Sequence, residues 1–137
     1  MADLTVTAAN VRPLDGAVCR GFKLGGAAAP GDCVYVASDG DVEKADANVS
    51  LATAAGIGVV VAIQGGKSSG VAGDSVTVCM FGPVAGFSGL TPGARAYVSD
   101  TAGKLSTTAG TAKRCMGFAE SATVFFVAPE QNDPSSA

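Results

Sequence analysis

Residues 91–105 read TPGARAYVSDTAGKL, and residues 29–42 read APGDCVYVASDGDV, so the chain contains nearly the same pattern twice. Each copy begins with a Pro-Gly turn, continues through a mostly apolar run with a central tyrosine, and breaks at small polar residues before an apolar residue follows. This pattern predicts a β-hairpin. An internal repeat of this kind indicates two related β-units packed as one body. We therefore expect related hairpins at Tyr35 and Tyr97.

Segments of alternating or β-branched residues surround the two hairpins and predict further strands. These segments are 17–24, 57–63, 73–82, 115–119 and 123–127. Pro83 predicts a break after the strand at 73–82, and residues 46–55 could form at most a helical turn or two. Residues 115–119 resemble 57–60, so the second unit repeats the first beyond its hairpin. Nine or ten short strands with little helix predict an all-β fold, a compact barrel or sandwich whose two halves span about 17–63 and 73–128.

The length of 137 residues fits one domain with a single sizeable core. We expect residues 1–16 to form an N-terminal arm or edge strand and residues 17–128 to form a single β domain. Residues 129–137 lack core-forming side chains and predict a flexible polar tail.

Composition narrows the classes of partner. The net charge is −3 without any cluster of Lys or Arg, which disfavours nucleic-acid binding. Apolar residues make up 47% of the chain and the mean hydropathy is +0.35, so we expect some apolar surface to be buried between copies in a homo-oligomer. The sequence has no apolar run long enough to span a bilayer and does not begin like a signal peptide, so we expect no membrane partner and a protein made and kept in the cytoplasm.

Catalytic and metal chemistry find little support in the residue types. The chain has no histidine, which excludes Ser-His-Asp and Cys-His sites. The four cysteines, Cys19, Cys33, Cys79 and Cys115, match no metal or redox spacing, so we interpret them as buried apolar residues without disulfides. Most carboxylates lie in or beside turns, which favours local backbone hydrogen bonds over a glycosidase pair. We expect no enzymatic activity, metal, cofactor or structural disulfide.

Tyr35 and Tyr97 occupy matching positions in the repeat, which leaves two interpretations. The pair could line a site for a stacked ligand, or both side chains could pack in the repeat core or in an interface. Packing is favoured, because a tyrosine flanked by valine in a strand usually buries its ring and leaves its hydroxyl in water.

Four segments, 31–46, 73–78, 86–100 and 117–123, together resemble small structural proteins of tailed bacteriophages, the capsid decoration or cement proteins and related head-fibre base domains. The resemblance covers roughly residues 5–128 and consists of turns and strands rather than a catalytic motif. It implies a non-enzymatic virion protein, favoured to be a trimer, that assembles in the host cytoplasm. Such a protein binds the major capsid protein on the outside of the expanded head and stabilises neighbouring capsid subunits.

Two other classes remain open. One is a phage fibre or adsorption module that binds a host-surface glycan, and the other is a subunit of a cytoplasmic enzyme. Glycan-binding modules usually present exposed aromatic rings, and the absence of tryptophan argues mildly against that class.

The N-terminal segment, residues 2–11, is our candidate for contact with the capsid or with a neighbouring protomer. Leu4, Val6 and Val11 make it apolar enough to pair as a strand, and a turn at residues 13–16 separates it from the body. The alternative is that residues 4–11 pair within their own domain.

Overall fold

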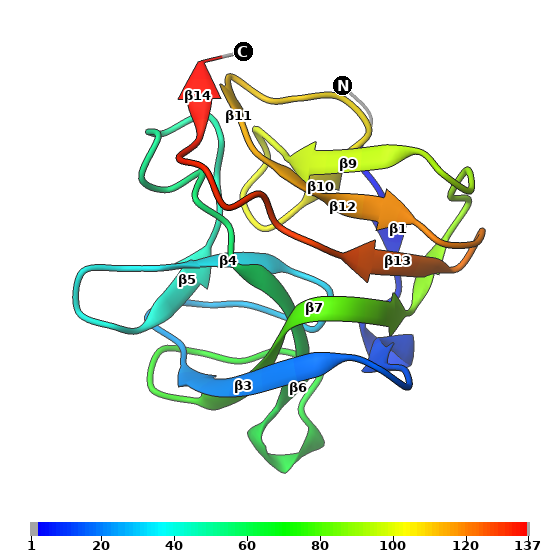
Figure 1. Ribbon diagram of the computed structural model, residues 1–137. Helices are drawn as coiled ribbons and strands as arrows, with labels where there is room; N and C mark the ends of the chain where they lie inside the picture. The colour runs from blue at the N-terminus through cyan, green and yellow to red at the C-terminus, as the bar shows by residue number, and fades with distance from the viewer. Residues whose placement is uncertain (1–2, 137) are drawn as a thin grey trace.

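The structure, a computed structural model, describes residues 3–136 and is all-β. Its strands are β1 (Thr5–Val6), β2 (Arg12–Pro13), β3 (Val18–Lys23), β4 (Cys33–Val36), β5 (Val42–Lys44), β6 (Gly58–Ile63), β7 (Ser75–Ala85), β8 (Phe87–Ser88), β9 (Arg95–Val98), β10 (Leu105–Ser106), β11 (Ala112–Lys113), β12 (Cys115–Ala119), β13 (Val124–Val127) and β14 (Ser135–Ser136). Two short 3-10 turns, η1 (Ala8–Asn10) and η2 (Gln64–Gly66), interrupt them. Figure 1 shows one curled antiparallel sheet with smaller strand pairs at its margins.

The main sheet confirms the doubled architecture in its strand order. That order is β10-β9-β12-β13-β7-β6-β4-β5, so each end carries a hairpin, then the strand that follows the hairpin, then a central strand. The first unit is β4-β5-β6-β7 and the second is β9-β10-β12-β13. The predicted hairpins are both present, with Tyr35 opposite Glu43 and Tyr97 opposite Ser106. The unit boundaries differ from the expected halves, because β7 belongs with the first unit and pairs with β13 of the second.

The two ends of the curled sheet meet through loop backbone. The turn of the second hairpin supplies Gly103, whose carbonyl accepts the N–H of Cys33 and whose N–H donates to the carbonyl of Ala45, both at 2.8 Å. The N–H of Ala47 likewise donates to the carbonyl of Ser99 at 3.0 Å. These bonds join the two units on the side away from β7 and β13 and enclose a main core that includes Val59, Met116 and Phe125.

The central strand β7 does not break where the sequence predicts. It continues through Pro83, which lies opposite Phe126 and whose carbonyl accepts the N–H of Leu14 at 2.9 Å. The irregularity falls at Gly82 instead, where φ is +117° and an added Cβ would lie 2.6 Å from the Cα of Ala17. Gly82 therefore permits a local twist just before Pro83, and this twist lets β7 continue through the proline.

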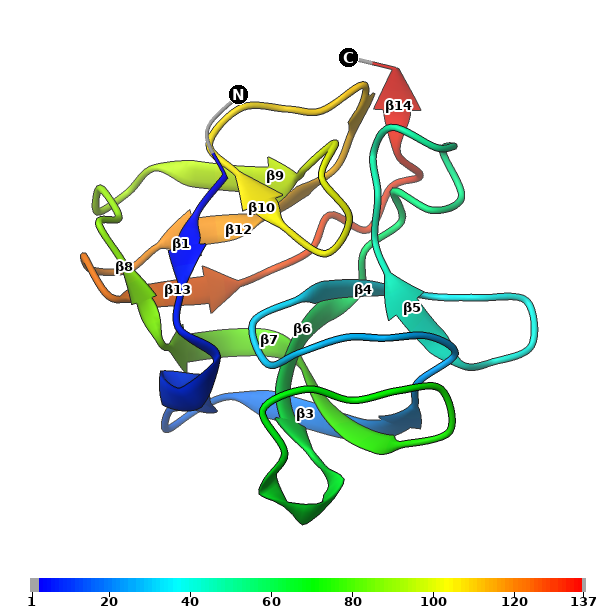
Figure 2. The same cartoon turned by 180° about the vertical axis from the view of Figure 1, so that it is seen from behind.

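The two terminal segments lie against the body. Residues 3–6 run beside β10 and β8, and Figure 2 shows β1 next to β8. Residues 135–136 pair with β11, and Pro134 is buried. The expected polar tail therefore pairs with the domain at its far end. No helix within residues 46–55 forms, and this stretch consists of turns.

Candidate interaction surface

The outward face of the main sheet is the face opposite the main core. It is covered over the first unit and more open over the second. Over the first unit a second apolar cluster fills this face, and its buried members are Leu24, Ala28, Val34, Val42, Val60, Ile63, Val76 and Val78. Leu24 and Ala28 come from the connector after β3, so a loop covers the first unit. The outward face over β3, β7, β13 and β12 is more open, since Val18 and Phe81 there are exposed.

That more open area carries an aromatic strip, which we define as Val18, Phe81, Phe126 and Phe118. Their strands, β3, β7, β13 and β12, are neighbours in the sheet. The Phe81 and Phe126 rings meet edge to face with centroids 5.1 Å apart, and the Phe126 and Phe118 rings stack, also at 5.1 Å. Val18 lies opposite Phe81, and these two side chains are 56% and 51% exposed. Half of the chain's phenylalanines therefore form an outward apolar surface.

The strip has a cation at one end. Arg95 on β9 is exposed and lies opposite Phe118 in the sheet. A row of rings on adjacent strands that ends at an arginine has the side-chain types enriched at protein interfaces. Because the rings stand on paired strands, their positions are fixed before any partner binds, which lowers the entropic cost of binding.

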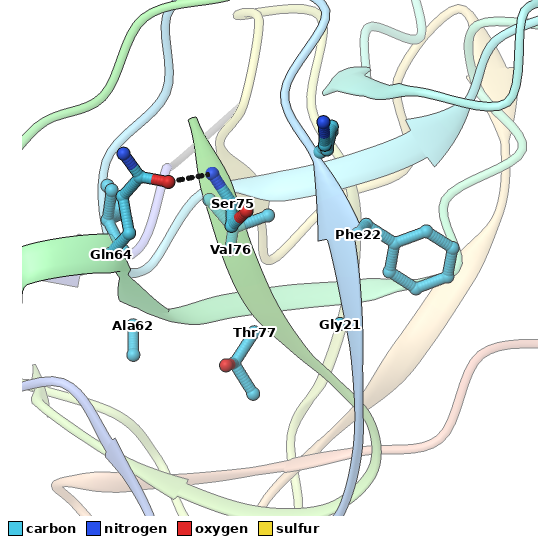
Figure 3. A pocket seen from close by; sticks show the side chains of 9 residues that line it. Gly21, Phe22, Ala62, Gln64, Ser75, Val76 and Thr77 are labelled. Carbon is cyan, nitrogen blue, oxygen red and sulfur yellow. Dashed lines mark hydrogen bonds between the residues drawn. The ribbon is translucent and has the colours of Figure 1, made fainter. Parts of the chain in front are cut away.

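A hollow over β3, β7 and β6 is a weaker candidate. Its volume is about 510 Å³, and Figure 3 shows Gly21, Thr77 and Ala62 side by side on β3, β7 and β6. These three residues lie opposite one another on adjacent strands, so small side chains line the hollow. The Gln64 side chain at its rim is already engaged, because its Oε1 accepts the N–H of Ser75 at 2.8 Å. The hollow offers few free polar groups with which to orient a ligand.

The predicted contact residues of the N-terminal segment face their own domain. Leu4 and Val6 are half-buried and Val11 is buried, and all three pack on the main core. The N–H of Leu4 donates to the carbonyl of Leu105 at 2.7 Å. The structure thus shows the alternative in which residues 4–11 pair within their own domain, and contact of this segment with a capsid or another protomer stays a prediction. Residue 2 of the predicted segment lies outside the described residues.

The two repeat tyrosines do not pack alike. Tyr35 packs against the main core, and partial burial, followed by the carboxylates of Glu43 and Asp39, raises its pKa. Ala96 and Val98, on either side of Tyr97, are both in the main core, so strand alternation places Tyr97 on the outward face. There it lines a hollow of about 410 Å³ together with charged residues of β11 and the C-terminal segment.

Two of the turn carboxylates, Asp32 and Asp74, accept backbone hydrogen bonds, as predicted from the sequence. Asp32 Oδ2 accepts the N–H of Ala29 at 2.9 Å, and Asp74 Oδ2 accepts the N–H of Val71 at 3.0 Å. Both residues are nonetheless buried. Asp74 also pairs with Lys67, whose Nζ lies 3.2 Å from Asp74 Oδ2. These carboxylates serve as local turn acceptors.

The aromatic strip is the feature that sequence reasoning missed. The sequence-based predictions assign no outward face to the phenylalanines, yet the consecutive Phe125 and Phe126 cannot both face inward on a regular strand. Phe125 is fully buried and packs near Phe87 at a centroid distance of 5.7 Å, so Phe126 faces outward. The Phe-Phe pair was therefore a usable signal for one outward ring.

Residues 3–136 hold no group of three or more His, Cys, Asp or Glu side chains arranged to bind a metal ion. In the same residues, no helix has the length and apolar character needed to cross a membrane. No protein-family model matches this sequence, and neither does any curated protein to which it was compared.

Proposed function

We propose that this protein is a non-enzymatic structural subunit of a tailed-phage virion, a decoration or cement protein that binds the outside of the head and stabilises neighbouring capsid subunits. The proposal takes its class of partner, the major capsid protein, from the resemblance over residues 5–128. The observation that carries it is the aromatic strip, a preformed apolar surface on the outward face of the sheet.

The strip has the chemistry of a modest docking contact. Burying the exposed half of the Phe81 ring contributes about 1 kcal/mol, and the exposed part of Val18 contributes a similar amount. A homo-oligomer, for which a trimer is favoured, repeats this contact in each subunit and thereby gains avidity on a symmetric shell. Many modest contacts of this kind suit a protein that coats a surface.

Binding to heads tests the proposal directly. Purified full-length protein is mixed with undecorated, expanded heads of the cognate phage, and co-sedimentation and head survival on heating are measured. The wild type should bind and raise heat resistance, and Phe81→Ser should weaken binding at least tenfold because the exposed ring is lost. Val71→Ser is the matched control, since Val71 is 63% exposed in a loop apart from the strip, and should bind like the wild type.

Three results would redirect the interpretation. If the wild type neither binds nor stabilises heads and instead labels host cells or glycans, the fibre or adsorption module replaces the decoration protein. If it binds none of these, the virion proposal fails. If Phe81→Ser and the wild type bind heads equally, the decoration role stands and the strip is not its contact surface.

A further inference from the structure

Two of the four cysteines stand directly opposite each other on neighbouring strands. Cys19 on β3 and Cys79 on β7 are register partners in an antiparallel ladder. Opposed residues in such a ladder have Cα atoms about 4.5–5.5 Å apart, and disulfides span Cα separations of about 4.4–6.8 Å. The backbone therefore already holds the two cysteines at bonding range.

The side chains of this pair share one face and interact. Both pack on the main core, Cys79 as a buried member and Cys19 as a half-buried neighbour. Burial, followed by the nearby Cys19 thiol, raises the pKa of Cys79 to about 12. The Cys79 thiol donates weak hydrogen bonds to the carbonyls of Phe81 and Gly82, at 3.6 and 3.9 Å. These bonds are easily given up.

The other two cysteines have no such arrangement. Cys33 lies opposite Val59, and Cys115 lies opposite Tyr97. Both are buried, and desolvation raises the pKa of Cys33 to about 12. They therefore serve as internal controls for any reaction at the opposed pair.

We propose that Cys19 and Cys79 are a modification site, a dithiol that closes to an intramolecular disulfide when the folded protein meets an oxidising disulfide such as oxidised glutathione. The inference is independent of the proposed function, because it depends only on the pairing of β3 with β7. In a reducing cytoplasm the pair stays a dithiol, and it closes after transfer to an oxidising medium.

The reaction proceeds by two thiol–disulfide exchanges. The half-buried Cys19 thiolate, the more exposed of the two, attacks one sulfur of oxidised glutathione, forms a mixed disulfide and releases one glutathione thiolate. The Cys79 thiolate then attacks the Cys19 sulfur and releases the second glutathione. The two protein thiols lose two electrons and two protons, and these reduce one oxidised glutathione to two thiols.

The Cys19–Cys79 disulfide would hold the outer strand β3 against β7. β3 pairs with β7 along one edge and has no other strand partner among residues 3–136, so it is a place where the sheet can open. A link from Cys19 to Cys79 closes a loop of about 60 residues and should raise the thermal unfolding midpoint by about 5–15 °C.

The test uses the full chain, purified reduced and incubated with oxidised glutathione. After denaturation and alkylation with N-ethylmaleimide, the reduced protein should carry four adducts and the oxidised protein two, with a peptide map linking Cys19 to Cys79. Cys79→Ser should stop at a glutathione adduct on Cys19, and Cys19→Ser should form no disulfide. Cys115→Ser should form the same link as the wild type and leave one alkylated thiol.

The wild-type map decides the matter without relying on any variant. Four adducts after oxidation, a link that involves Cys33 or Cys115, or disulfides found only between chains would each overturn the proposal. A correct link with an unchanged unfolding midpoint would overturn the stabilising effect on β3. Head binding plays no part in these readouts, so their failure is distinct from failure of the proposed function.

Discussion

Asp32 and Asp74 accept the same kind of turn hydrogen bond, but their pKa values move in opposite directions. For Asp32, burial raises the pKa above 3.8, although the Ala29 N–H and the charges of Lys44 and Lys104 oppose the change. For Asp74, the Val71 N–H and then the hydrogen bond from Lys67 lower the pKa below 3.8. The direction in which the pKa of a buried turn carboxylate moves therefore depends on all the hydrogen-bond donors and charges around it.

These directions predict opposite effects on stability. The folded protein binds a proton at Asp32 more readily than the unfolded chain does, so its contribution weakens as pH rises from 3.8 through the raised pKa. Asp74 contributes fully above 3.8 and loses its contribution as pH falls through the lowered pKa. Relative to wild type, Asp74→Asn should therefore lose stability as pH rises, and Asp32→Asn should gain it.

Thermal unfolding followed by circular dichroism from about pH 2.5 to pH 7 measures both differences. Each variant serves as the control for the other, since both remove one buried carboxylate from a turn. Differences that run in the same direction with pH would contradict the assignment.

At the scale of the elements, a glycine occupies the strand after the hairpin in each unit. Gly58 lies in β6 and Gly117 lies in β12, and an added Cβ would overlap the carbonyl oxygen of Cys79 or of Phe126, respectively. The two glycines thus allow β6 to approach β7 and β12 to approach β13 in the same way. Gly117 also has φ at +140°, where other residues are strained.

Gly58→Ala and Gly117→Ala should each lower the free energy of unfolding by about 2–4 kcal/mol, because the neighbouring backbone must move. Gly21→Ala in β3 is the control, since the nearest atom to its added Cβ is 3.9 Å away and it should cost less than about 1 kcal/mol. Denaturant unfolding gives these values. Equal costs at all three positions would mean that close approach is not what the glycines provide.

The repeat pattern explains how far the sequence could predict these elements. Pro-Gly turns and alternating residues locate both hairpins. Pro83 was misjudged because the accommodation comes from Gly82, whose backbone conformation no pattern of apolar residues encodes. The different environments of Tyr35 and Tyr97 were also out of reach, since which face becomes the main core depends on the other unit.

For the whole molecule, the N-terminal segment acts as part of the fold. Val6 and Val11 pack against Gly31, and Val11 also meets Gly86, so the segment fills space between the two units. A sequence can show that this segment is apolar, but whether it covers its own domain depends on edges formed by residues 87–106. The aromatic strip was equally hard to predict, because Phe81 on β7 is far in the chain from Phe118 and Phe126 on β12 and β13.

Removal of residues 2–11 should lower the free energy of unfolding by about 3–5 kcal/mol, because one buried and two half-buried apolar side chains leave the core. Thr5→Ala is the control and should change stability by less than about 0.5 kcal/mol, since Thr5 is exposed. Chemical denaturation of the monomeric or oligomeric protein at fixed concentration measures both. If the truncated protein keeps its stability and loses head binding, the segment is a contact arm after all.

The pairing of β1 with β8 also sets an order in time. At a synthesis rate of about 5–20 residues per second, Ser88 follows its partner Thr5 by about 4–17 seconds. The pairs within β4, β5, β6 and β7 need only residues 33–85, so the first unit can form before β1 has its partner strand β8. Asp3 can pair only later, because its bridge partner Ser106 is made after Ser88. Residues 3–6 can therefore join the sheet only after residues 87–106 have been made.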